Sequence, residues 1–370
     1  MIAVTLLAAI IVTAVIYKGK SAQNDRIERL NEITAYFKDP ANLPTEIPMT
    51  ESDVTLLLNE IVNVTSREAN ERANYFRALA LAKATDGTDV GARIAAFAKD
   101  VEMESALRVK LFGVVGRRSE ASALDALISF ASQTDDTTAA GAALRAAGKM
   151  ATASNFQSLL GIIANSPNGS IKSEAVKVLS EVISKSEDPE SYSAPIIAAY
   201  KSVADDVSSN ALLRLMGSAG GDQAADLVAD QLESGDETAK IAAIYALRYW
   251  PNDEQFDRLL EYTTSETKDK LRREAFESLI YFLKECEGVE EDDRSFYWND
   301  VAAIASGKTE QMYVVSSMVE QTGEWADDIL DYFIENSKSD DVVAMAEKAK
   351  DRLAERLRRL KRSGNSDEDE

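Results

Sequence analysis

The sequence predicts an all-α protein: a solenoid of about eight or nine stacked helix pairs, preceded by an N-terminal transmembrane helix. Three observations lead to this prediction. A helical pattern recurs every 32 residues over most of the chain, a shorter apolar helix separates each recurrence from the next, and the chain begins with a long apolar run without charges.

The repeat is clearest in residues 237–283, where one helical pattern ends and the same pattern begins again. Ala243 and Leu247 lie one turn apart in the first copy, and Ala275 and Leu279 have the same offset in the second. Leu279 follows Leu247 by 32 residues. Such a spacing predicts one structural unit that is repeated.

An apolar position continues this series toward the N-terminus in steps of 32 or 36 residues. The series, called here the apolar column, consists of Leu79, Leu111, Ala147, Leu179, Leu215, Leu247 and Leu279. Four extra residues add about one helical turn of 3.6 residues, so the apolar stripe keeps its phase. The repeating element is therefore expected to be a helix.

A second, shorter apolar helix is expected in each unit. These helices are predicted at Leu56–Val62, Ile94–Ala98, Leu124–Phe130, Phe156–Ile163, Ile196–Tyr200, Leu227–Leu232 and Phe256–Leu260. A single helix pair cannot bury its apolar face alone, so the pairs are expected to stack on one another.

At this level the chain resembles a known family. The phrases AKIAAIYALRYWPNDEQFDRLLEY (residues 239–262) and LRREAFESLIYFL (residues 271–283) resemble HEAT-like repeats of the bacterial, bilin-lyase-like type, as do Gly113 and Gly217 just after the apolar column. The resemblance covers roughly residues 51–350. It implies a protein-binding scaffold in most cases and a bilin lyase or DNA glycosylase in a minority, so it does not transfer an activity.

Composition argues against catalysis and against nucleic acid. The chain has 41 basic and 63 acidic residues, a formal net charge of −22, whereas nucleic-acid binding needs a basic surface. It has no histidine and a single cysteine, Cys286. The commonest general base and metal ligand is thus missing. We expect no enzyme activity, cofactor or metal; a bilin-lyase-like or other HEAT-fold enzyme remains the alternative.

Residues 1–17 are predicted to be a transmembrane anchor. The apolar side chains that would face lipid include Ile2, Leu6, Leu7, Ile10, Ile11, Ile16 and Tyr17. The 16 uncharged residues 2–17 would span about 24 Å, a little less than the roughly 30 Å hydrocarbon core. A cleaved signal peptide is the alternative, and the absence of Lys or Arg before the apolar run argues against it.

Charge predicts the orientation. Lys18, Lys20, Arg26 and Arg29 all follow the apolar run, and the positive-inside rule then places the C-terminal body in the cytoplasm. The expected location is the inner cell membrane, crossed once. The alternative is an exported, periplasmic-facing binding module.

Residues 18–50 are expected to connect the anchor to the repeats. Ile27, Leu30, Ile33 and Phe37 have helical spacing and predict an amphipathic stalk, after which Pro40, Pro44 and Pro48 predict an extended connector. Thr50 and Asp53 form a capping-box pattern, so the repeats are expected to begin at residue 51 and to continue to residue 338.

Two parts of the C-terminal half differ from the regular repeats. Residues 245–334 contain 15 of the 26 aromatic residues, which favours a well-packed core and leaves a partner surface as the alternative. The acidic stretch from Cys286 to Asp300 interrupts the 32-residue step and is expected to be a solvated insertion, since it lacks the spacing of a calcium loop.

The last helix, residues 339–362, is expected to cap the stack. Its predicted apolar stripe consists of Ala346, Ala349, Leu353, Leu357 and Leu360, with many Lys and Arg around it. A terminal repeat needs a polar outer face, although a basic amphipathic helix can also bind an anionic membrane or an acidic partner. Residues 363–370 are predicted to form an acidic, disordered tail.

The partner-binding hypothesis concerns the second helices of the pairs, which line the concave side in HEAT-like repeats. Their polar positions include Arg214, Lys240, Arg248, Arg272, Arg273 and Glu277. We expect an acidic partner segment along Arg248, Arg272 and Arg273 with Tyr249 beside it. Alternatively, these arginines make only ion pairs within the repeats. The sequence thus predicts a membrane-anchored scaffold or adaptor in a membrane-associated protein complex, with its oligomeric state left open.

Overall fold

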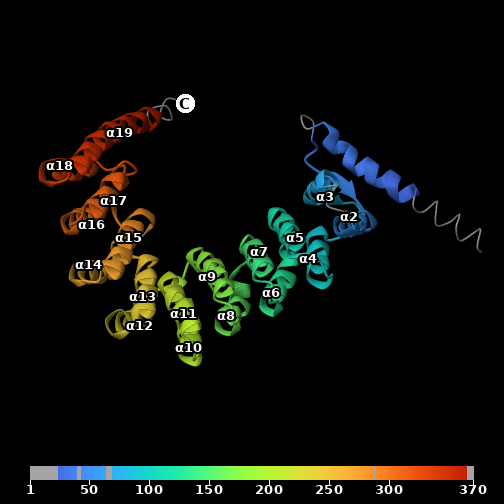
Figure 1. The fold of residues 1–370 in the computed structure, drawn as a ribbon, viewed down its shortest axis with the longest axis horizontal. Coiled ribbons are helices and arrows are strands. Elements are labelled where there is room, and N and C mark those ends of the chain that lie inside the picture. The colour runs from blue at the N-terminus through green and yellow to red at the C-terminus, as the bar shows by residue number, and fades with distance from the viewer. Residues whose placement is uncertain (1–23, 40–42, 64–68, 287–288, 365–370) are drawn as a thin grey trace, which may run out of the picture. The chain divides into compact units, whose positions relative to one another are not determined.

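The computed structural model describes residues 24–39, 43–63, 69–286 and 289–364. Helices dominate these ranges, which confirms the all-α class (Figure 1). The chain divides into two compact units, Met1–Val182 and Ile183–Glu370, which are described separately below. Within the described ranges nine pairs of long helices follow one another, from α2 and α3 to α18 and α19.

The first unit begins with a helix at residues 24–35 that continues into the 3₁₀ turn η1 (Tyr36–Lys38). Two short strands follow, β1 (Ile47–Met49) and, after the first helix pair, β2 (Ala82–Ala84). The paired helices are α2 (Glu51–Asn63), α3 (Ala69–Leu81), α4 (Val90–Asp100), α5 (Ser105–Arg118), α6 (Leu124–Gln133), α7 (Thr137–Gly148), α8 (Phe156–Asn165) and α9 (Gly169–Ser184).

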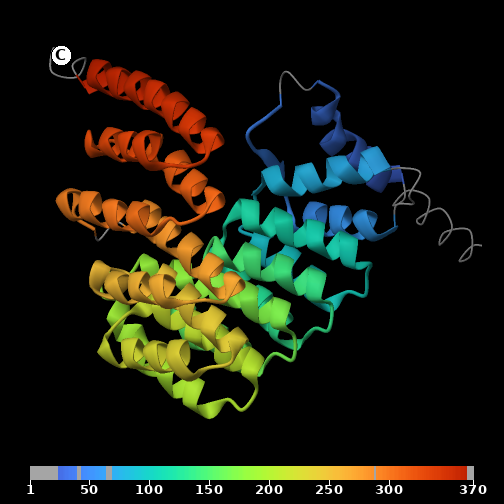
Figure 2. The same ribbon diagram turned by 60° about the vertical axis from the view of Figure 1, so that its left-hand side comes forward.

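The second unit continues the same pattern (Figure 2). Its helices are α10 (Ser193–Ser202), α11 (Asp206–Ala219), α12 (Asp222–Ser234), α13 (Glu237–Arg248), α14 (Phe256–Ser265), α15 (Asp269–Glu285), α16 (Glu291–Ile304), α17 (Lys308–Met318), α18 (Trp325–Asn336) and α19 (Asp340–Gly364). In the two units together, the first helix of four pairs is preceded by a 3₁₀ turn. These turns are η4 (Ala121–Ala123) and η5 (Ala153–Asn155) in the first unit, and η6 (Pro189–Tyr192) and η7 (Asp253–Gln255) in the second.

Second helices pack on second helices within each unit. In the first unit α3 contacts α5 and α5 contacts α7; in the second, α11, α13, α15, α17 and α19 contact one another in that order. The apolar column lies on the second helices of the pairs, and each of its seven side chains is at most 1% exposed. The period read from the sequence therefore identifies the residues that join neighbouring pairs.

The two glycines after the column have different surroundings. A Cβ atom on Gly217 of α11 would lie only 2.0 Å from the carbonyl oxygen of Ala246 on α13. A Cβ atom on Gly113 of α5 would have no heavy atom within 4 Å. Only Gly217 is required for close contact of two helices, because real atoms do not approach to 2.0 Å.

The predicted transmembrane anchor, residues 1–17, lies outside the described residues. Among the residues that are described, none of the helices is long and apolar enough to cross a membrane. Residues 24–35 form the helix expected from the spacing of Ile27, Leu30 and Ile33. This helix packs on the first helix pair: Ile33 is 1% exposed, and Arg26 and Arg29 form ion pairs with Glu60 and Asp53 of α2.

The proline-containing connector forms one edge of a small parallel sheet. Ile47, Pro48 and Met49 pair with Ala82, Lys83 and Ala84, in that register. Ile47 and Met49 are each 1% exposed while Pro48 between them is exposed, the alternation expected of a half-buried strand. Pro48 is tolerated because it lies on an edge strand. The sequence did not predict this pairing.

One C-terminal expectation is corrected. Residues 291–300, expected to be part of a solvated insertion, lie in α16, which packs on α17 and α18 and buries Trp298 completely.

The predicted stripe of α19 is buried at Ala346, Ala349 and Leu353, whereas Leu360 is 45% exposed. The stripe is thus more exposed toward the end of the helix.

Candidate functional site

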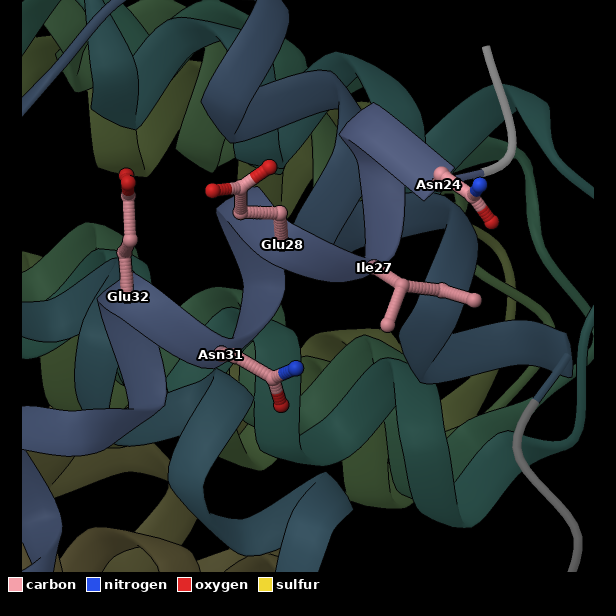
Figure 3. A pocket seen from close by; sticks show the side chains of 5 residues that line it. All are labelled: Asn24, Ile27, Glu28, Asn31 and Glu32. Carbon is pink, nitrogen blue, oxygen red and sulfur yellow. The ribbon is translucent and has the colours of Figure 1, made fainter. Parts of the chain in front are cut away.

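Depressions on the surface of the described residues are the first place to look for a functional site. One of about 470 Å³ lies on helix 24–35 and is lined by Asn24, Ile27, Glu28, Asn31 and Glu32 (Figure 3). These five side chains come from one helix and include no cation or nucleophile. Among the described residues, no group of three or more acidic or cysteine side chains is placed to hold a metal ion.

A second depression, of about 390 Å³, lies near the end of α15. Both of its cations are engaged within the chain, since Lys284 pairs with Glu320 at 2.5 Å and Arg294 donates to the carbonyl oxygens of Cys286 and Val289. The side chain of Cys286 is buried. Glu285 adds an exposed charged side chain to this depression, which offers no accessible thiol.

Arg272, a predicted partner contact, fastens neighbouring helix pairs instead. Its guanidinium donates to the carbonyl oxygens of Thr263 at 2.6 Å and Ile304 at 2.9 Å, and to both carboxylate oxygens of Glu310 at 3.1 Å. These acceptors belong to α14, α16 and α17. Arg108 has a similar role in the first unit, where it bonds to the carbonyl oxygens of Ala98 and Val101.

The other predicted residues of α15 lie on its exposed side. Arg273 is exposed, and no described residue bonds to it. Glu277 accepts a long hydrogen bond, 3.5 Å, from the hydroxyl of Tyr313 on α17. The structure therefore does not bring Arg272 and Arg273 together with Arg248 as one row of free cations.

Arg248 lies in an aromatic setting. Its guanidinium carbon is 3.8 Å from the ring centroid of Tyr281, 5.5 Å from that of Tyr245 and 5.6 Å from that of Tyr249. The rings of Tyr249 and Tyr281 meet edge to face with centroids 5.1 Å apart. A cation this close to aromatic faces is attracted by their quadrupoles.

Arg214 of α11 extends this group. Its guanidinium carbon is 4.9 Å from the ring centroid of Tyr245. Together these residues form what is called here the arginine–tyrosine cluster: Arg214, Tyr245, Arg248, Tyr249 and Tyr281. The cluster joins three successive second helices, α11, α13 and α15.

The two arginines of the cluster lack oxygen partners. The Nε atoms of Arg214 and Arg248 are both buried and have no hydrogen-bond partner. Within the described residues, their only interactions are those with the tyrosine rings. A buried donor without an acceptor costs about 1–3 kcal/mol, so this arrangement calls for an explanation.

The hydroxyl group of Tyr281 adds no charge near neutral pH. Burial and the neighbouring Tyr249 raise the pKa of Tyr281 to about 12. Its phenol is therefore neutral at pH 7, and the positive charge of the cluster comes from the two guanidinium groups. Tyr249 itself is 43% exposed, so part of the cluster reaches solvent.

The sequence contains a signal that identifies the missing tyrosines. Tyr249, Tyr281 and Tyr313 are 32 residues apart on α13, α15 and α17, the period of the apolar column. Tyr313 is 42% exposed. Following the repeat with exposed positions as well as buried ones would have found Tyr281 and Tyr313. Arg214 and Tyr245 do not follow the period, and only the packing of α11 on α13 brings them together.

Comparison with known proteins identifies no family. No protein-family model matches the chain, and no curated protein matches its sequence. A solved structure described as "Computational Design of Self-Assembling Cyclic Protein Homooligomers" aligns over 93% of this chain and 99% of its own, with 11% identity and a TM-score of 0.13. At that TM-score the likeness supports no argument about fold or function.

Proposed function

We propose that the protein is a membrane-anchored, non-enzymatic scaffold that binds other proteins through a solenoid of HEAT-like helix pairs. The observation that carries the proposal is the arginine–tyrosine cluster, which spans three successive second helices and is partly open to solvent. Arg and Tyr are enriched where proteins bind one another. Helical repeats stack into extended surfaces that suit such binding.

The anchor belongs to the same proposal. Residues 1–17 insert into the inner membrane and the positive charges that follow keep the repeats in the cytoplasm. The docked helix 24–35 then holds the first helix pair close to the membrane, in a membrane-associated protein complex. Nucleic acid is an unsuitable partner for a chain with a net charge of −22.

The test is affinity purification of the full chain from native membranes, with mild detergent and a C-terminal tag. A stable protein partner at a fixed ratio supports the scaffold. A pigment or other small molecule that co-purifies without a protein partner would replace the scaffold by a bilin-lyase-like enzyme.

Topology is tested separately with a reporter fused after Glu370. The proposal expects reporter activity on the cytoplasmic side and a full-length chain that stays in the membrane through a carbonate wash. A shortened chain that begins near residue 22 and is released to the periplasm would establish the exported binding module.

A further inference from the structure

Two positive charges in the second unit share one aromatic ring. Arg214 and Arg248 both contact Tyr245, at 4.9 and 5.5 Å from its centroid, and neither forms an ion pair with a described residue. Like charges held near each other in a half-buried place repel. A negative ligand would relieve this repulsion and accept the unused hydrogen bonds.

The other half-buried arginines show that this chain does supply oxygen partners. Those that donate hydrogen bonds to carbonyl or carboxylate oxygens are Arg29, Arg108, Arg118, Arg258, Arg272, Arg294 and Arg356. Acidic residues outnumber basic ones by 63 to 41. A scarcity of carboxylates therefore does not explain why the cluster has no oxygen partner among the described residues. The two arginines of the cluster differ from these seven, because neither donates a hydrogen bond to an oxygen atom of a described residue.

The chemistry of the cluster selects the ligand. A guanidinium that stacks on a ring keeps its edge free for a carboxylate, which it binds through two parallel N–H···O bonds. Exposed rings such as Tyr249 provide contact area for the residues on either side of that carboxylate. We infer that the arginine–tyrosine cluster binds Asp or Glu side chains of an acidic, extended segment in the partner protein.

This inference rests on the proposed scaffold function and names the chemistry of its partner. Two guanidinium groups match one or two carboxylates. A nucleic acid needs a basic surface several phosphates long, and the strongly acidic chain does not provide one. The acidic chain repels a short acidic segment less than it repels a long polyanion. Exposed charges more than about 10 Å apart are largely screened at 0.1 M salt.

The experiment uses a displayed library of random peptides, about twelve residues long, selected on the full-length protein in detergent. Counter-selection on the double variant Arg214→Gln and Arg248→Gln removes peptides that bind elsewhere. We expect the recovered peptides to be enriched in Asp and Glu. The best one is then synthesised with a fluorescent label, together with a version in which Asn and Gln replace its Asp and Glu, and binding is measured by anisotropy.

The expected result is at least about tenfold weaker binding for the amide peptide on the unchanged protein, a comparison that needs no variant to fold. Arg248→Gln and Arg214→Gln, each checked for unchanged helicity by circular dichroism, should each lose a similar factor. Arg77→Gln is the matched control, because Arg77 is exposed on α3, outside the three helices of the cluster, and no described ring contacts it; it should change affinity less than about twofold.

Three results would overturn the inference: recovered peptides without enrichment in acidic residues, equal affinity for the acidic and amide peptides, or an equal loss with Arg77→Gln. A further test adds inorganic phosphate at millimolar concentration. If phosphate displaces the labelled acidic peptide as effectively as excess unlabelled peptide does, the inference is also wrong, because the site would then bind anions without peptide specificity. If the double variant Arg214→Gln/Arg248→Gln recovers a partner from membranes as well as the unchanged protein does, this inference is wrong, whereas the proposed scaffold function remains supported.

Discussion

Arg29 and Asp53 join helix 24–35 to the first repeat helix through two parallel hydrogen bonds, of 2.8 and 2.9 Å. The same carboxylate accepts the backbone N–H of Thr50 at 2.9 Å, while the Thr50 hydroxyl accepts the N–H of Asp53 at 3.3 Å. This is the capping box that the sequence predicts at the start of α2. One side chain therefore begins the repeats and also holds the preceding helix against them.

Replacement of Asp53 tests this double role through pH. The hydrogen bonds from Arg29, and those from Thr50, lower the pKa of Asp53 below its usual value. A carboxylate with a lowered folded-state pKa stabilises the fold above its unfolded pKa of about 3.9, and this contribution is lost as the pH falls through the folded value. Asp53→Asn should lower the unfolding free energy by about 1–3 kcal/mol at pH 7 in urea titrations.

The difference between the Asp53→Asn variant and the unchanged protein should shrink once the pH falls below about 4. Limited trypsin digestion at pH 7 should also cleave the variant faster after Arg26 and Arg29, because helix 24–35 loses its attachment. A stability difference that stays constant between pH 7 and pH 3 would show that the charge of Asp53 is not the cause.

Gly217→Ala tests the close packing of α11 on α13. The new methyl group would meet the Ala246 carbonyl oxygen, a contact that requires the two helices to separate, and overpacking of this kind costs about 1–3 kcal/mol or more. Gly113→Ala is the control, because the site is open and Ala favours a helix over Gly by about 0.5–1 kcal/mol. Urea unfolding should show opposite signs, and loss of stability in both variants would contradict the structure.

Within α16, Trp298 belongs to the core and Phe296 to the surface. Trp298 is completely buried, whereas Phe296 is 68% exposed. Trp298→Ala should reduce the unfolding free energy by about 3–5 kcal/mol in denaturant titrations followed by far-ultraviolet circular dichroism. Phe296→Ala should change it by no more than about 0.5 kcal/mol. Similar losses for the two variants would mean that α16 packs through a different face.

Arg272→Gln should act on stability and not on binding. It removes hydrogen bonds to the carbonyl oxygens of Thr263 and Ile304 and leaves the half-buried Glu310 without its ion pair. We expect a loss of about 2 kcal/mol or more in unfolding free energy. The neighbouring Arg273→Gln is the control, with an expected change within about 0.5 kcal/mol. If the folded Arg272→Gln variant binds the acidic peptide more weakly than the unchanged protein does, Arg272 contributes to binding and this prediction is wrong.

The sequence predicted the parts of this fold that depend on local pattern. The apolar column and the short first helices follow from helical periodicity, and burial of each position needs only a neighbour of the same kind. The pairing of Ile47 with Ala82 was not predictable in this way, because it joins strands on either side of a whole helix pair. The hydrogen bonds of Arg272 were missed for a related reason. The helical pattern predicts where an arginine lies on a helix, but it does not predict whether the guanidinium reaches solvent or the carbonyl oxygens of neighbouring helices.

The candidate site divides along the same line. Arg248 and Tyr249 were predicted as partner contacts, and they lie in one cluster. Their neighbour Tyr281 could have been found from the 32-residue period. Arg214 was also predicted to lie on the concave side, but its contact with Tyr245 was not predicted. That contact depends on how closely α11 approaches α13, a distance that Gly217 helps to set and that no helical pattern encodes.

The small sheet of β1 and β2 has a mechanical consequence. β1 precedes the first helix pair and β2 follows it, so the two strands close that pair into a loop. A pulling force applied at residue 24 meets the Arg26–Glu60 and Arg29–Asp53 pairs first and the hydrogen bonds between the strands next, before it reaches the helices within the loop. Tension on the N-terminus would thus detach helix 24–35 and open the sheet while the later helix pairs stay folded, so the first unit yields to load in a fixed order.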